Sequence, residues 1–190
     1  MNDETITLHV PTPDGEFIAR YSTKGLASLD FPSKRTGETA CANAGASPQV
    51  LAWHRAATAA IRQTLAGRAA EILPPLDFSG GTEFQRAVWA AMRQIPTGQT
   101  LSYGEIARRI GRPKSVRAVG GACGANPIPV LVPCHRVLAA NRKLGGFPGD
   151  WSGSDCCLNA KGCAFSEPAF GRSCRVRKSS AVHQPIRTGP

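Results

Sequence analysis

The 190-residue sequence has no hydrophobic run that approaches the roughly 18 residues a membrane-spanning helix requires. Its beginning, MNDETITLHV, is polar and acidic, so it also lacks the basic segment followed by an apolar one that marks a secretory signal. These absences argue against an integral membrane protein and against a secreted one. We therefore expect a cytoplasmic protein without a membrane partner.

The sequence also lacks a C-x-x-C pair and any matched group of Cys and His at zinc-ligand spacing. Seven cysteines are present, an odd number, so at least one thiol stays unpaired within the chain. They are Cys41, Cys123, Cys134, Cys156, Cys157, Cys163 and Cys174. We expect reduced thiols and no metal site.

Acidic residues are few relative to basic ones. The chain has 13 Asp and Glu against 23 Lys and Arg, which gives a formal net charge of +10. Such a charge attracts polyanions, and nucleic acid is the commonest polyanionic partner. A solvated basic surface without a specific partner is the alternative that charge alone leaves open.

Residues 1–81 have the pattern of a small α/β domain. Apolar residues alternate in ITLHV and again in ASLDF, and the turn sequence PTPDG precedes a further run, EFIARY, so we expect strands of one small sheet. Ser47 followed by Pro48 predicts the start of a helix. The expected apolar stripe of this helix consists of Leu51, His54, Thr58, Ile61 and Leu65. The segment ILPPLDFSGG is predicted to be a linker.

Residues 82–147 predict a mostly helical second domain. Thr82 with Gln85, and Ser102 with Glu105, stand at capping-box spacing, so a helix is expected to begin at each pair. A third helix is expected from near Pro113, and with the second it has the outline of a helix-turn-helix whose second helix exposes basic residues. A simple corner between two helices with a solvated basic face is the alternative.

The stretch LVPCHRVL, residues 131–138, places a cysteine and a histidine at a break between two apolar runs. The preceding VLV is expected to form a buried strand that Pro133 ends. In a regular strand Cys134 and His135 would point to opposite faces, whereas at an irregular turn a water could bridge them. These residues alone leave two interpretations open: a nucleophilic thiol, or a small buried side chain beside a surface histidine.

The motifs SYGEIA, RAVGGA, NPIPVLVPCHRV and GGF occur in an order and at a spacing that resemble the O6-alkylguanine-DNA alkyltransferases, also called methylated-DNA-protein-cysteine methyltransferases. The resemblance covers about a third of the chain, from about Thr82 to Phe147, and residues 1–81 resemble the family's amino-terminal domain only in outline. It implies DNA repair by irreversible transfer of an alkyl group from O6-alkylguanine, and from O4-alkylthymine, to a cysteine. No metal or organic cofactor is implied, and each molecule is expected to act once.

The resemblance also implies a role for each residue that matches the family motif. Cys134 matches the nucleophile, and His135 matches the histidine that helps take the thiol proton through a water. Asn126 matches the asparagine that orders the active-site turn, and Tyr103 matches the phenol that donates a proton to the leaving base. Arg117 matches the side chain that fills the gap left by the flipped base.

The implied partner is double-stranded DNA containing alkylated guanine, bound through its minor groove by a monomer that is nucleoid-associated if the source is bacterial. The expected DNA-contacting residues are Lys114, Ser115, Arg117, Gly121 and Arg136. The expected substrate pocket consists of Pro129, Val137, Leu144, Gly145 and Phe147.

The family pattern stops after Phe147. The family continues there with a serine, two glycines, a leucine and an amphipathic helix, whereas this chain has PGDWSGSDCCLNAKGCAF. Codons chosen for DWSGSDCCLNAKG, read one base earlier, encode GLERKRLLLEREG, which follows the family pattern. We hypothesise that a single-base deletion at Pro148, in the gene or in its sequencing, shifted the frame. Residues 148–190 are then an irregular tail without the glutamate that orients the family's histidine.

Two other functions remain open at this point. Without the glutamate, the protein could bind alkylated DNA while transferring little. A transcription regulator built on the helix-turn-helix is the third possibility, although no dimerisation or effector segment is visible in the sequence.

Overall fold

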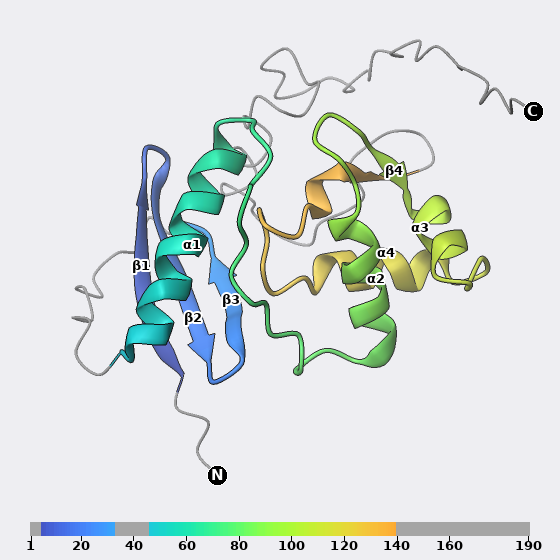
Figure 1. Cartoon of the computed structure of the whole chain (residues 1–190). Coiled ribbons are helices and arrows are strands. Elements are labelled where there is room, and N and C mark those ends of the chain that lie inside the picture. Colours follow the sequence, from blue (N-terminus) through green and yellow to red (C-terminus); the bar gives the residue numbers. More distant parts are fainter. Residues whose placement is uncertain (1–4, 33–45, 140–190) are drawn as a thin grey trace, which may run out of the picture.

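The computed structural model describes residues 5–32 and 46–139. They form a small sheet covered by one long helix and, beside it, a group of shorter helices (Figure 1). The sheet is antiparallel, with strand order β1-β2-β3. Its strands are β1 (Ile6–Thr12), β2 (Gly15–Ser22) and β3 (Gly25–Asp30).

The predicted alternation of the first strand is confirmed, because Leu8 and Val10 are buried. The third strand departs from strict alternation. A register shift beside Tyr21 lets Leu26 join Leu29 in the core. Gly25, the first residue of β3, has a φ of +147°. A Cβ added there would lie 2.3 Å from the Pro75 carbonyl oxygen, so only glycine fits at this position.

Helix α1 (Pro48–Leu65) begins where the sequence predicts, since the Ser47 hydroxyl accepts a hydrogen bond from the Val50 amide at 3.3 Å. The predicted apolar stripe is rotated from the observed one. The fully buried side chains are those of Ala57, Ala60 and Ile61, whereas most of the predicted stripe lies at the boundary of the buried face. The alanines let the helix lie close to the sheet. A stripe drawn through the larger side chains does not predict that these small residues face the core.

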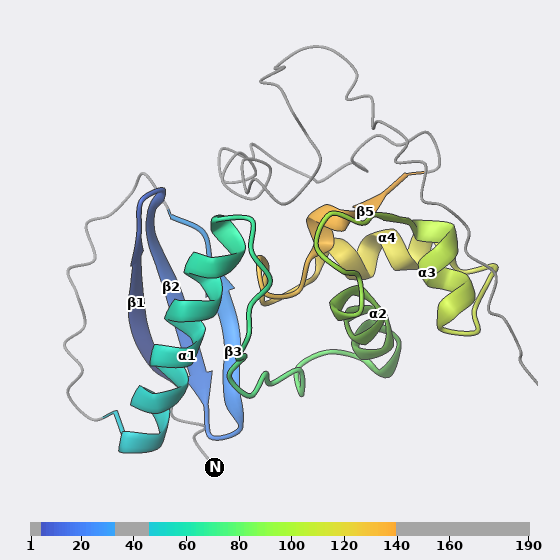
Figure 2. The same ribbon diagram turned by 45° about the horizontal axis from the view of Figure 1, so that its top comes forward.

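In the described part of the chain, α2, α3 and α4 make up the helical half (Figure 2). Both predicted capping boxes are present, at Thr82 with Gln85 and at Ser102 with Glu105. The third helix begins later than predicted, at Val116, because residues 110–115 form a turn that includes Gly111 at φ +70°. The helices are α2 (Glu83–Arg93), α3 (Tyr103–Arg109) and α4 (Val116–Gly124).

The prediction of a buried strand at VLV is wrong. Residues 130–132 form a turn, because Val130 has a positive φ of 71° and the Val132 amide donates back to the Ile128 carbonyl at 3.0 Å. Prolines at 127, 129 and 133 cannot donate the hydrogen bonds of a strand ladder. After the turn, β5 (Val137–Leu138) pairs in parallel with β4 (Leu101–Ser102).

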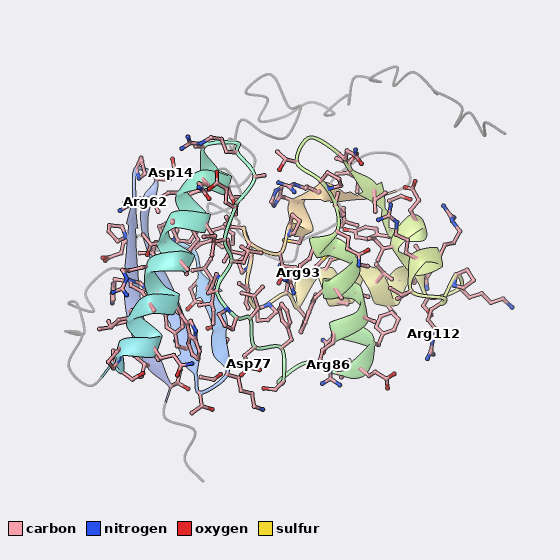
Figure 3. All side chains as sticks on the ribbon, in the orientation of Figure 1. Asp14, Arg62, Asp77, Arg86, Arg93 and Arg112 are labelled. Atoms are coloured by element: carbon pink, nitrogen blue, oxygen red, sulfur yellow. The ribbon has the colours of Figure 1, made fainter. Side chains whose placement is uncertain are left out.

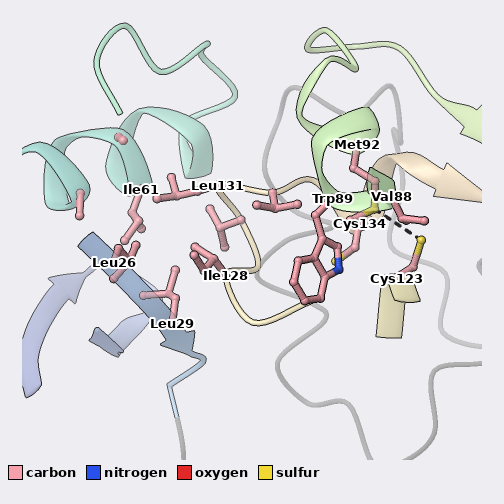
Figure 4. Packing of buried hydrophobic residues seen from close by; sticks show 14 of the residues in the cluster. Leu26, Leu29, Ile61, Val88, Trp89, Met92, Cys123, Ile128, Leu131 and Cys134 are labelled. Carbon is pink, nitrogen blue, oxygen red and sulfur yellow. Dashed lines mark hydrogen bonds between the residues drawn. The ribbon is translucent and has the colours of Figure 1, made fainter. Parts of the chain in front are cut away.

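One hydrophobic core runs through both halves. Figure 4 shows Ile128 and Leu131 between the sheet residues Leu26 and Leu29 and the helical residue Trp89. The Leu29 amide also donates to the Pro127 carbonyl at 2.9 Å, which ties β3 to the turn before Cys134. A domain boundary at residue 81 stays a prediction, and the predicted tail, 148–190, lies outside the described residues.

No helix in the described part of the chain is long and apolar enough to cross a membrane. Nor do residues 5–32 and 46–139 bring together three or more His, Cys, Asp or Glu side chains that could hold a metal ion.

Candidate active site

Cys134 opens a single 3-10 turn, η1 (Cys134–Arg136), directly after the buried turn at residues 128–133. The backbone hydrogen bonds of this region are short-range. The Leu131 amide donates to Pro129 at 2.9 Å, and the Cys134 amide donates to Val132 at 2.8 Å. The cysteine therefore sits on a tightly folded loop and not in a strand, which is the condition under which Cys134 and His135 can share a site.

Asn126 ties the two ends of this loop together. Its Nδ2 donates to the Val132 carbonyl at 2.9 Å, and its Oδ1 accepts from the Ile128 amide at 3.1 Å. Both partners are backbone groups of buried residues, so the side chain replaces the hydrogen bonds that a strand ladder would have provided. This geometry agrees with the turn-ordering role that the family resemblance implies for Asn126.

The Cys134 side chain is free and 5 % exposed. It borders a cavity of about 280 Å³ together with Cys123, Asn126 and Pro129. Burial raises the pKa of the Cys134 thiol, while hydrogen bonds from the Asn126 side chain and from backbone amides act in the opposite direction. A thiol in this environment is protonated near neutral pH, so its use as a nucleophile requires a base.

His135 is also 5 % exposed, and its Nδ1 has no hydrogen-bond partner in the described part of the chain. Burial, aided by the positive charge of Arg136, lowers the pKa of this imidazole from 6.5 to about 4. The ring is therefore neutral at pH 7 and has a lone pair able to accept a proton. The neutral ring can accept a proton, but the lowered pKa of His135 and the raised pKa of Cys134 both oppose transfer of the thiol proton in the free protein.

Arg136, which is expected to contact DNA, is turned into the protein. The side chain is 9 % exposed, and its Nη1 donates to the Ile95 carbonyl at 2.9 Å while Nη2 donates to Thr97 Oγ1 at 3.3 Å. These bonds fasten η1 to the segment that follows α2. Sequence alone does not distinguish such an inward arginine from an outward one, because both follow the same short motif.

Two contacts between α2 and α4 position the helices beneath the thiol. Trp89 Nε1 donates to the Ala122 carbonyl at 2.8 Å, and the Cys123 thiol donates to Met92 Sδ at 3.4 Å (Figure 4). Burial raises the pKa of Cys123 to about 12, so this second sulfur stays a thiol. Both Trp89 and Cys123 therefore pack in the core between α2 and α4.

The remaining predicted site residues divide by exposure. Tyr103 is the first residue of α3 and is half-buried. Pro129 and Val137 are buried, and Pro129 borders the cavity beside Cys134. Lys114, Ser115, Arg117 and Gly121 lie on α4 or just before it, all exposed except the half-buried Ser115. Leu144, Gly145 and Phe147 lie outside the described residues.

The wall of the cavity formed by β3 was not predicted. Ser28, Asp30 and Phe31 border the same space as Cys134, so the sheet contributes directly to the surroundings of the thiol. No short motif marks these residues, and their role depends on the contact between β3 and the loop at residue 127.

The chain is similar to known proteins of one family. The model of the 6-O-methylguanine DNA methyltransferase DNA-binding domain matches residues 83–162. The methylated-DNA-protein-cysteine methyltransferase of Salmonella typhimurium is 50% identical over 84 residues, which are 44% of this chain and 49% of that protein. The inducible enzyme of that name from Bacillus subtilis is 45% identical over 107 residues, 56% of this chain and 59% of the relative. The chain thus spans about half the length of these curated relatives.

Among solved structures, Mycobacterium tuberculosis OGT in complex with DNA is 34% identical and superposes with a TM-score of 0.61, covering 82% of this chain and 92% of that one. The O6-methylguanine-DNA methyltransferase of Pyrococcus kodakaraensis, at 20% identity and a TM-score of 0.53, shares the fold. A buried cysteine on an asparagine-tied loop, the domain match and this similarity over nearly a whole relative lead to one conclusion: the chain belongs to the methylated-DNA-protein-cysteine methyltransferase family.

Proposed function

We propose that this protein repairs alkylated DNA by transferring the alkyl group from O6 of guanine, and from O4 of thymine, to Cys134. The observation that supports it best is the thiol itself, which is buried, free, bordered by a cavity and adjacent to a histidine that is neutral at pH 7. The names of the relatives favour transfer over lesion binding alone.

The reaction balances without a cofactor. His135, acting through a water, takes the thiol proton, and the sulfur attacks the alkyl carbon as the bond from that carbon to O6 breaks. The electron pair of the broken bond goes to the guanine, which takes a proton from Tyr103. The product is a thioether with no easy leaving group, so one protein molecule removes one lesion.

We propose that α3 and α4 act as a helix-turn-helix whose second helix enters the minor groove. Exposed Lys114 and Arg117 supply positive charge at the start of α4, and Gly121 has open space where a side chain would be. Because Cys134 is only 5 % exposed, a base that stays stacked in the duplex cannot reach it. The lesion is therefore expected to flip out, with Arg117 filling the gap.

We further propose that the protein acts as a monomer in the cytoplasm, and on the nucleoid if the source is bacterial. A protein that contacts one lesion with one thiol requires no second subunit for the chemistry. The basic composition, 23 Lys and Arg against 13 Asp and Glu, favours electrostatic attraction between the protein and DNA.

The test is covalent trapping of the label. The full chain is incubated with a duplex carrying O6-methylguanine with a radiolabelled methyl group, and label on the protein is measured after denaturing electrophoresis. We expect about one methyl group per folded molecule, none with Cys134→Ser, and retention of labelling with Cys123→Ala, which removes the neighbouring buried thiol. Duplex binding without label on folded parent protein would instead favour the lesion-binding function.

A further inference from the structure

A second cavity, of about 210 Å³, lies between the end of α1 and the segment that follows α2. Cys134 does not line it. Three arginines do, Arg68, Arg93 and Arg136, together with the hydroxyl-bearing residues Thr64 and Thr97. None of the residues described as lining it is Asp or Glu, so its wall carries positive charge without a compensating carboxylate.

The charge of Arg136 is the most unusual feature of this wall. The guanidinium is buried, yet its two recorded acceptors, the Ile95 carbonyl and Thr97 Oγ1, are both neutral. Its Nε has no hydrogen-bond partner in the described part of the chain. A buried cation without an anion carries a desolvation cost that neutral acceptors offset only in part, so this position favours a nearby negative charge.

Arg93 and Arg68 provide the accessible contacts. Both are exposed, and within residues 5–32 and 46–139 neither guanidinium makes an ion pair or a hydrogen bond. Arg68 follows α1, whereas Arg93 ends α2, and Figure 3 labels Arg93 between the two halves of the molecule. An anion held by both would join the end of α1 to the end of α2.

We propose that this cavity binds a phosphate-sized tetrahedral oxyanion. Guanidinium groups match such oxyanions through paired N–H donors, and threonine hydroxyls can add neutral donors. The volume exceeds the roughly 30 Å³ that one water occupies in the liquid, which leaves room for a small polyatomic ion. The bound ion would place negative charge near Arg136 and thereby steady η1, the turn that carries the nucleophile.

The chemistry is shared by free phosphate and by a phosphodiester of the DNA backbone. We assign the site to the free ion, because the cavity is lined from α1 and the segment after α2, whereas the exposed basic residues predicted to meet DNA belong to α4. The site goes beyond the proposed alkyl transfer, and a binding measurement tests it whether or not Cys134 accepts an alkyl group.

The test is calorimetric titration of the full chain with sodium phosphate, at an ionic strength held constant with sodium chloride. We expect saturable binding that weakens about tenfold or more in Arg68→Gln/Arg93→Gln, as the loss of two charge-assisted contacts implies. The matched control is Arg55→Gln/Arg86→Gln, which removes two exposed arginines outside the cavity and should leave phosphate binding unchanged.

A parallel arm measures the affinity of the same proteins for an undamaged duplex. Absence of saturable phosphate binding to the parent would overturn the proposal, and so would equal weakening in both double variants, which would indicate only general charge attraction. Weakened duplex binding in Arg68→Gln/Arg93→Gln without any binding of free phosphate would assign the arginines to DNA and likewise refute the free-ion site.

Discussion

Replacing Asn126 with alanine tests whether one side chain holds the loop that carries Cys134. The substitution removes the donor to the Val132 carbonyl and the acceptor of the Ile128 amide, at 2.9 and 3.1 Å. Each stranded backbone group costs about 1–3 kcal/mol when buried. Because Asn126 itself is only half-buried and water can reach part of the gap, we expect a total loss of about 2–4 kcal/mol.

The measurement is urea unfolding of the full chain, followed by tryptophan fluorescence. The matched control is Gln99→Ala, an exposed amide whose recorded hydrogen bond is made by its backbone, and we expect its stability to change by less than about 0.5 kcal/mol. Asn126→Asp should fall between parent and alanine, because the carboxylate keeps the acceptor for Ile128 and loses the donor to Val132.

The same variants separate loop order from thiol chemistry. The Asn126 side chain acts against the burial that raises the pKa of Cys134, so both substitutions should slow methyl transfer per folded molecule, and the added negative charge of aspartate should slow it further. If Asn126→Ala unfolded at the same urea concentration as the parent and transferred methyl groups at the parent rate, the structural role assigned to this residue would be refuted.

Three further outcomes are expected. The pKa of His135 is about 4 in the folded protein, against 6.5 for an ordinary imidazole. The neutral form therefore contributes stability above pH 6.5 that is lost as the pH falls towards 4. This loss in the free energy of unfolding is at most about 3 kcal/mol. Urea unfolding at pH 7 and 4.5 should show a smaller acid loss in His135→Gln than in the parent, and an equal loss would contradict this. Trp89→Phe keeps a ring but strands the buried Ala122 carbonyl, so it should lower the free energy of unfolding by about 1–3 kcal/mol. Trp53→Phe should not reproduce this effect, because the Trp53 indole makes no hydrogen bond in the described part of the chain. Lys114→Gln should reduce the slope of log K against log salt for duplex binding by about 0.9 if it contacts one phosphate, whereas an unchanged slope would exclude that contact.

The sequence was informative where local rules decide structure. The caps at Ser47, Thr82 and Ser102 involve residues within three positions of one another, so they are visible in the sequence and are confirmed. The alternation of Leu8 and Val10 also identified the buried face of β1, because strand periodicity needs no knowledge of the partner strand.

Prediction failed where distant segments decide. The VLV run has strand composition, but the positive φ of Val130 and the bonds made by Asn126 fold it into a turn. The inward position of Arg136 depends on acceptors about 40 residues earlier in the chain, at Ile95 and Thr97. The β3 wall of the thiol cavity depends likewise on the bond between Leu29 and Pro127. Local sequence patterns contain no record of such partners.

The burial of the Cys134 sulfur also affects how fast the thiol is lost to oxidation or to small alkylating compounds. A protein that can act once is wasted whenever its thiol meets a stray oxidant or a small alkylating compound. Here the sulfur is 5 % exposed and its pKa is raised by burial, so both access and thiolate content are low in the free protein. General thiol reagents should therefore consume it slowly, which would keep the sulfur available for the alkyl transfer proposed above.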